Sequence, residues 1–211
     1  MSSDPIESVL ADARRLFDVA GINSTEEGNW LILGLETSDE RDLDEFTRQE
    51  DGNINFLAGF DKHIRPRLEK LIEIAGERGI NAEIFGNCGY PRGQELKIKQ
   101  SAVTAGLVQW GRNSMVMHPE HGLNLRFSVI KLQSTRLVAT QPGEISYKLS
   151  PQCTSCKACQ ESCPVSIISE GRVTDAQACL ASLHNMTGDK RLSWCRVCID
   201  VCPAGQSSVN T

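Results

Sequence analysis

The feature that most constrains this chain is the placement of its cysteines. Eight of the nine lie between Cys153 and Cys202, and Cys88 lies outside that window. The N-terminal residues carry no basic segment followed by an apolar run, so we expect no secretory signal and a cytoplasmic location. Thiols stay reduced in that compartment. Clustered cysteines there favour metal binding or redox chemistry over a disulfide framework.

The first four clustered cysteines form the run C-x2-C-x2-C-x3-C-P, which ends at Cys163 and Pro164. Bacterial ferredoxins use this spacing to hold [4Fe–4S] clusters. Three close thiolates can reach three irons of one cube, while the cysteine before proline turns toward a second cluster. Zinc is the alternative, but zinc ligands usually come as separated C-x2-C pairs. The spacing therefore favours iron–sulfur clusters.

A second run repeats the ending C-x2-C-x3-C-P, with its first cysteine, Cys179, displaced upstream by an insertion. In two-cluster ferredoxins, the cysteine before each proline ligates the other cluster. This rule assigns the eight thiolates to cluster 1 (Cys153, Cys156, Cys159 and Cys202) and to cluster 2 (Cys163, Cys179, Cys195 and Cys198). For Cys179 the alternative is a small buried residue, because free cysteine is often buried.

The first 150 residues hold only Cys88, so the composition changes near Ser150 and Pro151. Apolar periodicity predicts helices and strands in alternation. The helices are expected over 5–20, 58–78 and 95–106, and the strands over 30–35, 81–85, 115–117 and 123–132. This pattern indicates an α+β fold. We expect an α/β domain over 1–150, with a corrinoid or substrate pocket, and a two-cluster domain over 151–211.

Composition excludes some partners. The chain has 22 basic and 27 acidic residues and a net charge of −5, which argues against a nucleic-acid partner. No apolar run approaches the roughly 20 residues that span a bilayer, so we expect no membrane association. The acidic stretch from Glu36 to Asp51 is read as a solvated face rather than a docking site.

The residues around the cysteine runs resemble the epoxyqueuosine reductase and reductive dehalogenase superfamily. The resemblance lies in the segment AVTAGLVQWGRN, which ends at Asn113, in the turn HPEHG that begins at His118, and in the two cysteine runs. It implies a nitroreductase-like α/β domain followed by a bacterial two-[4Fe–4S] ferredoxin-like module. It also implies that the α/β domain holds a base-off corrinoid, cobalamin, with cofactor-binding roles for Gly106, Gly111, Arg112 and Asn113.

The sequence departs from that superfamily at two positions. Val108 stands where the family has glycine, and valine does not adopt glycine's backbone angles cheaply. Asn87 stands near the position of an acidic proton donor in epoxyqueuosine reductases, and an amide cannot donate as a carboxylic acid does. These departures leave the substrate open.

Four further residues are weaker candidates. Cys88 and Tyr90 lie in a glycine-rich loop, where they could act on a cofactor or substrate or simply pack the loop. They are the candidates for a catalytic role, which is otherwise unknown. His118 and His121 could ligate a metal, but the proline and glycine beside them favour a structural turn.

Three functions are compatible with these features. The first is an iron–sulfur redox protein that passes electrons through two [4Fe–4S] clusters to a cofactor or small-molecule substrate in the α/β domain. That protein would be an oxidoreductase, a cobalamin-dependent reductase in the form that the resemblance implies, fed by a donor such as ferredoxin or flavodoxin. The second is a non-enzymatic electron carrier or redox subunit that docks on a partner enzyme. A cluster-bearing structural or sensing protein is a third reading.

Overall fold

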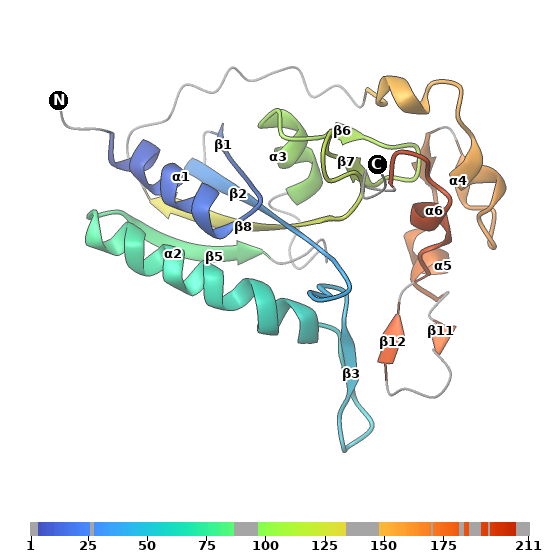
Figure 1. The fold of residues 1–211 in the computed structure, drawn as a ribbon, viewed down its shortest axis with the longest axis horizontal. Coiled ribbons are helices and arrows are strands. Elements are labelled where there is room, and N and C mark those ends of the chain that lie inside the picture. The colour runs from blue at the N-terminus through green and yellow to red at the C-terminus, as the bar shows by residue number, and fades with distance from the viewer. Residues whose placement is uncertain are drawn as a thin grey trace. The chain divides into compact units, whose positions relative to one another are not determined.

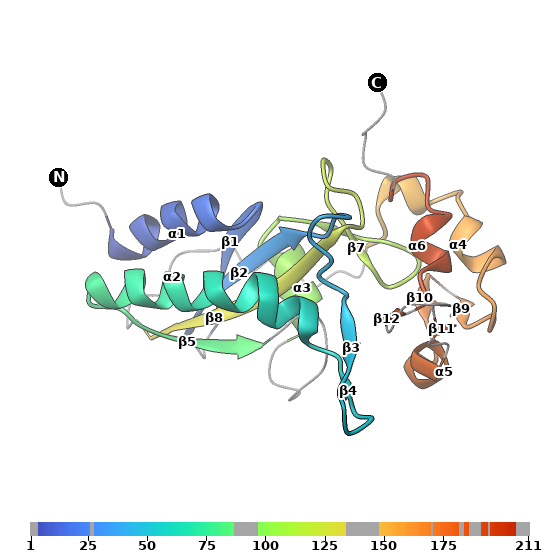
Figure 2. The same ribbon diagram turned by 60° about the horizontal axis from the view of Figure 1, so that its bottom comes forward.

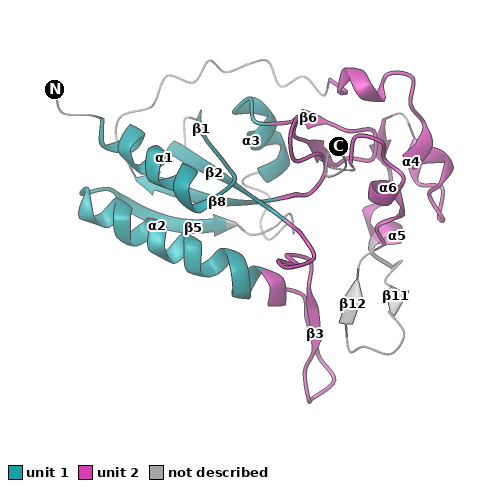
Figure 3. Cartoon of the chain, viewed as in Figure 1, with its two compact units in different colours: residues 1–36, 60–107, 126–146 teal, residues 37–59, 108–125, 147–211 magenta. Residues whose placement is uncertain are grey.

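The computed structural model describes residues 4–25, 28–86, 97–133, 148–169, 171–181, 184–185, 191–193 and 195–205. The chain divides into two compact units, shown in different colours in Figure 3. Unit 1 comprises residues 1–36, 60–107 and 126–146, and unit 2 comprises residues 37–59, 108–125 and 147–211. Each unit is built from separate stretches of the sequence.

Unit 1 is an antiparallel sheet with helices packed against it (Figure 1). Its elements are α1 (Pro5–Leu16), β1 (Val19–Thr25), β2 (Gly28–Glu36), the π-helix η1 (Phe60–Ile64), α2 (Arg65–Glu77), β5 (Asn81–Gly86), α3 (Ile98–Thr104) and β8 (Leu125–Gln133). The strand order is β1-β2-β8-β5, with β1 antiparallel to β2 and β5 antiparallel to β8. The mixture of helices and strands confirms the α+β class.

Strand β2 forms the centre of the unit 1 core. Its residues are buried at every position from Asn29 to Leu35, so both faces of the sheet are covered at this strand. Helices α1 and α2 contact each other, and they lie side by side in both ribbon views (Figure 2). Helix α2 follows the π-helical turn η1, and Pro66 lies in its first turn, where a missing backbone N–H is tolerated.

The first helix is shorter than the periodicity predicts. Asp4 caps it, because its carboxylate accepts the backbone N–H of Ile6 at 3.0 Å. The helix ends at Leu16 rather than near residue 20, and strand β1 begins at Val19. Ala20 continues the helical spacing of apolar residues, but its burial comes from strand β1 and not from the helix. The expected end of this helix was therefore wrong.

Unit 2 consists of short elements. They are β3 (Phe46–Arg48), β4 (Ile54–Asn55), β6 (Gln109–Trp110), β7 (Val116–Met117), the 3-10 helix η2 (Pro151–Cys153), α4 (Ala158–Glu161), β9 (Ile168–Ser169), β10 (Arg172–Val173), α5 (Ala176–Ala181), β11 (His184–Asn185), β12 (Arg191–Ser193) and α6 (Val197–Asp200). Strands β6 and β7 pair, as do β9 and β10, and a third sheet has the order β11-β12-β3-β4. The insertion within the second cysteine run, between Cys179 and Cys195, thus pairs through β12 with strand β3 of the acidic stretch from Glu36 to Asp51.

The last stretch of unit 2 begins at Tyr147, close to the domain boundary expected near Ser150. Unit 2 also takes in residues 37–59 and 108–125, which the sequence reading places in the first domain. The division into domains at residue 150 stays a prediction. Among the described residues, no helix has the length and apolarity that crossing a membrane requires.

Candidate metal centre

Two cysteine-bearing segments of unit 2 contact the β6–β7 hairpin. They are residues 151–163, the first cysteine loop, and residues 195–205, the second cysteine loop, and each includes a short helix. The turn of the hairpin is closed by two hydrogen bonds: Gly111 N–H donates to the Met115 carbonyl at 2.7 Å, and Ser114 N–H donates to the Gly111 carbonyl at 3.2 Å. Ser114 adopts a left-handed conformation with φ of 59°. This conformation closes the turn so that three consecutive side chains, at positions 112, 113 and 114, contact three different segments of unit 2.

Arg112 contacts the first cysteine loop. Its Nε donates to the Cys156 carbonyl at 2.9 Å, and its Nη2 donates to the carbonyls of Cys153 at 2.7 Å and Thr154 at 3.4 Å. Asn113 contacts the second loop, where its Nδ2 donates to the Cys198 carbonyl at 3.1 Å. Ser114 Oγ accepts the N–H of Val173 at 2.8 Å.

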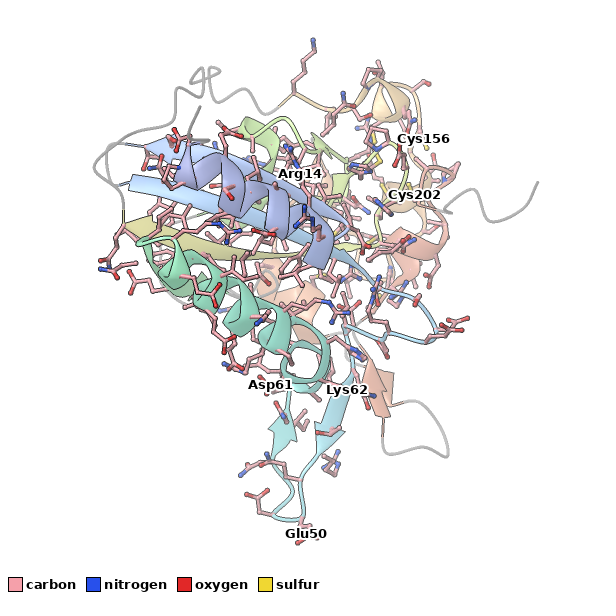
Figure 4. All side chains as sticks on the ribbon, turned by 60° about the vertical axis from the view of Figure 1, so that its left-hand side comes forward. Arg14, Glu50, Asp61, Lys62, Cys156 and Cys202 are labelled. Atoms are coloured by element: carbon pink, nitrogen blue, oxygen red, sulfur yellow. The ribbon has the colours of Figure 1, made fainter. Side chains whose placement is uncertain are left out.

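Four thiols form a first group. Burial raises the pKa of Cys159, and the neighbouring thiols of Cys153, Cys202 and Cys156 raise this pKa further. Burial also raises the pKa of Cys202, while the backbone N–H groups of Ala204 and Gly205 lower it. A cavity of about 310 Å³ opens between the two cysteine runs at this place, lined by Gln152, Cys153, Cys156, Cys202, Pro203 and Ala204. Figure 4 shows Cys156 and Cys202 on the same side of the unit.

A second group forms around Cys198. Burial raises its pKa to about 11, and the thiols of Cys179, Cys159 and Cys195 contribute to this rise. Asn113 acts in the opposite direction, because its side chain hydrogen-bonds the thiol and lowers the pKa. Cys163 is half-buried just after α4, and its place in this second group stays a prediction.

The spread of the thiols fits a multinuclear centre better than a single metal ion. With Zn–S bonds of about 2.3 Å, a tetrahedral zinc site needs sulfurs about 3.8 Å apart. Within the described residues, the group of three or more ligand atoms that all lie within 4.8 Å of one another is His118, Glu120 and His121, and it contains no cysteine. Among the described residues, no three cysteine sulfurs therefore lie within 4.8 Å of one another, and they form no ready-made tetrahedral zinc site.

The His118–Glu120–His121 group is a turn, as the sequence favours. His118 and Gly122 exchange backbone hydrogen bonds of 2.9 and 3.0 Å. His118 Nδ1 accepts the backbone N–H groups of Glu120 at 3.1 Å and His121 at 3.3 Å. The lone pair of that nitrogen is thus engaged in closing the turn.

The turn contacts the segment that follows Cys202, at Gly122. This residue has φ of +55°, and an added Cβ would lie 2.6 Å from the Ala204 carbonyl oxygen. We expect Gly122→Ala to destabilise unit 2 by about 2–4 kcal/mol in chemical denaturation, since overpacking adds to the backbone cost. Gly52→Ala is the matched control, because Gly52 has φ of +84° and nothing within 4 Å of an added Cβ. Equal losses in the two variants would contradict the contact.

The structure places the other candidate residues from the sequence in different surroundings. Gly106 follows α3 with φ of +72° and open space around it, and a Cβ at Gly111 would lie 2.9 Å from Asn113 Oδ1. The polar atoms of Arg112 and Asn113 engage the cysteine loops, so their role toward a corrinoid stays a prediction. The loop with Cys88 and Tyr90 lies outside the described residues. Sequence reasoning missed the contacts of Arg112 and Asn113, for which a single sequence carries no signal.

Comparisons with known proteins point to one superfamily. No protein-family model matches the sequence. Tetrachloroethene reductive dehalogenase of Sulfurospirillum multivorans is 30% identical over 125 residues, which cover 51% of this chain and 23% of that protein. A catabolic reductive dehalogenase superposes with a TM-score of 0.62 at 18% identity, over 98% of this chain and 33% of its own.

An epoxyqueuosine reductase solved with an epoxyqueuosine-modified tRNA stem loop superposes with a TM-score of 0.61 at 16% identity. The match covers 95% of this chain and 65% of that one. This chain therefore spans less than two thirds of the length of these three proteins. Its fold is the one that epoxyqueuosine reductases and a reductive dehalogenase share, and the resemblance to their superfamily is confirmed.

Proposed function

We propose that this protein is an iron–sulfur redox protein that holds two [4Fe–4S] clusters in unit 2. The observation that carries the proposal is the meeting of Cys202 with Cys153 and Cys156 around one cavity, beside the buried Cys159, whose pKa all three of these thiols raise. A cysteine from the second run joins three from the first, as the crossing rule requires. The relationship to reductases supports a reductase-like function.

When bound, the clusters supply one-electron transfer, and the chain supplies their environment. Burial of Cys153 and Cys159 keeps water from the sulfurs. The backbone N–H groups of Ala204 and Gly205 lower the pKa of Cys202 and so favour its negative charge. Cluster potentials respond to burial and to hydrogen bonds at sulfur. These residues would therefore set the potential at which electrons enter and leave.

The acceptor of the electrons defines two candidate functions. In the first, cobalamin or a small-molecule substrate takes the electrons in unit 1, as the resemblance implies, after a ferredoxin or flavodoxin donates them. In the second, the protein is an electron carrier or redox subunit for a partner enzyme. The second is favoured by the contacts of Arg112 and Asn113, whose polar atoms engage the cysteine loops. A cytoplasmic location and a partner other than nucleic acid belong to both candidates.

A titration with cob(II)alamin separates these candidates. The anaerobically reconstituted protein is titrated and followed by EPR and absorption. A saturable base-off cobalt signal would identify a corrinoid reductase. Two reducible clusters without corrinoid binding would identify a carrier.

The proposal predicts the metal content of the protein. After anaerobic reconstitution, the chain should hold about eight irons and about eight acid-labile sulfides, because eight cysteines ligate two cubes. Iron and sulfide assays and metal analysis give these numbers directly. One zinc per chain, with little iron, would contradict the proposal. Cys88→Ser is the matched control and should leave the iron content unchanged, because Cys88 lies outside both runs.

A further inference from the structure

The turn between β6 and β7 touches the carbonyl groups of both cysteine loops through two adjacent residues. Arg112 reaches the loop of Cys153 and Cys156, and Asn113 reaches the loop of Cys198. We propose that Arg112 and Asn113 are positioning residues that hold and tune the two clusters separately, Arg112 acting on cluster 1 and Asn113 on cluster 2. This inference rests on the proposed function and deepens it.

Arg112 can fix the separation of two consecutive ligands. The nitrogens of a guanidinium group are held in a rigid plane, so hydrogen bonds from Nε and Nη2 constrain two acceptors at once. Here the acceptors are the carbonyls of Cys156 at 2.9 Å and Cys153 at 2.7 Å. The side chain therefore spans the first two cysteines of the run. A lysine at this position would supply the charge without the planar fork.

Arg112 also brings a permanent positive charge to the first thiol group. Its guanidinium lies within hydrogen-bond distance of the carbonyls of Cys153 and Cys156, whose thiols belong to that group. A positive charge favours the more negative state of a nearby group, whether that group is a thiolate or a reduced cluster. The charge of Arg112 should therefore raise the reduction potential of cluster 1.

Asn113 acts on the second loop from a buried position. Its side chain is 5% exposed, and both ends of its amide are used. Oδ1 accepts the Met115 N–H at 3.2 Å, and Nδ2 donates to the Cys198 carbonyl at 3.1 Å. The amide thus brings a buried donor to the backbone of a ligating cysteine. A donor dipole beside a cluster stabilises negative charge there, so Asn113 should raise the reduction potential of cluster 2.

Ser114 anchors the turn to a third segment. Its left-handed backbone is uncommon for a residue with a side chain, and its Oγ accepts the N–H of Val173 on β10 at 2.8 Å. The turn is thus tied to a strand that carries no cysteine. It can orient Arg112 and Asn113 independently of either cysteine loop.

The test compares variants of the full chain after anaerobic reconstitution, with EPR-monitored redox titration and iron assay. Cys202→Ser and Cys179→Ser assign the signals to clusters 1 and 2. Arg112→Gln should shift the one-electron equilibrium of cluster 1 toward the oxidised state by about tenfold, which is about 59 mV. Cluster 2 should keep its potential in this variant. Arg48→Gln removes the same charge from an exposed position on β3 and should shift neither cluster.

Two conservative variants separate geometry from charge. Arg112→Lys should keep most of the potential of cluster 1 but lose its iron to a chelator several-fold faster, because the planar fork is gone. Asn113→Asp keeps the shape and the acceptor for Met115 but replaces the donor by a negative charge. It should shift cluster 2, and not cluster 1, toward the oxidised state. Asn113→Ala removes the donor without adding charge and should shift cluster 2 in the same direction by less.

Distinct outcomes would overturn the inference. Wild-type potentials for both clusters in Arg112→Gln and Asn113→Asp, with full iron content, would do so while leaving the proposed function intact. Equal shifts of the cluster 1 potential in Arg112→Gln and Arg48→Gln would mean that the shift comes from the net charge of the protein and not from the position of Arg112. Altered cobalamin binding with unchanged cluster signals would assign these residues to a corrinoid instead. A wild-type chain that takes up no iron would refute the proposed function, and this inference with it.

Discussion

Replacing Cys202 by serine is expected to abolish the cluster held by Cys153, Cys156 and Cys159 while the other cluster remains. The iron content should fall from about eight to about four per chain, since one cube of two is lost. The physical reason is the grouping of thiols in unit 2. Cys202 lies close enough to Cys153 and Cys156 for their thiols to raise its pKa. The same three residues line one cavity.

The reciprocal variant is Cys179→Ser. Its thiol interacts with that of Cys198, so the variant should lose cluster 2 and keep cluster 1. EPR spectra of the two variants, recorded after reduction, should each show one cluster signal, and the two signals should add up to the wild-type spectrum apart from magnetic coupling. If Cys202→Ser and Cys198→Ser lost the same signal, the crossed pairing would be refuted. The ligands would then follow the order of the sequence.

The closeness of the first three cysteines could be predicted, because it depends only on their spacing in the sequence. Spacings of three residues bring Cys153, Cys156 and Cys159 together within one short segment, whatever the rest of the chain does. The crossing of Cys202 to cluster 1 is expected from the proline beside it and from the ferredoxin pattern, and it stays a prediction. Strand β2 is predicted equally well, since a short apolar run between polar residues is typical of a buried strand.

The contacts of Arg112 and Asn113 could not be predicted, because they join residues 41 and 85 positions apart. The same holds for strand β12, where Leu192 pairs with Phe46. Nothing in the composition of the acidic stretch from Glu36 to Asp51 indicates that it forms a sheet with the insertion within the second cysteine run. The end of helix α1 was misjudged for a related reason: tertiary packing decides whether Ala20 is buried on a helix or on a strand.

The second large effect concerns stability, because the described elements around the cysteines of unit 2 are short. One buried cluster beside them consists of Met117, Leu123 and Cys153, joined by the partly buried Met115, Leu149, Ile199, Cys202 and Ala204. Helices α4 and α6 have four residues each, and helices so short are not stable alone in water. We infer that cluster binding supplies the missing free energy of folding, as metal binding does in other small metal-binding domains.

Removal of the clusters should therefore unfold the cysteine segments and spare unit 1. The test is hydrogen exchange of the protein after a chelator has removed its iron, with the thiols kept reduced. The amides of residues 153–169 and 195–205 should then lose about 3 kcal/mol or more of protection, so that they exchange about a hundredfold faster. Amides of β2 should keep their protection, because Trp30 and Leu31 are buried in unit 1, whose described residues include no cysteine. Equal protection of the cysteine segments with and without iron would contradict the coupling. The β6–β7 turn would then suffice to hold both loops, and Arg112 and Asn113 would stabilise the protein rather than the clusters.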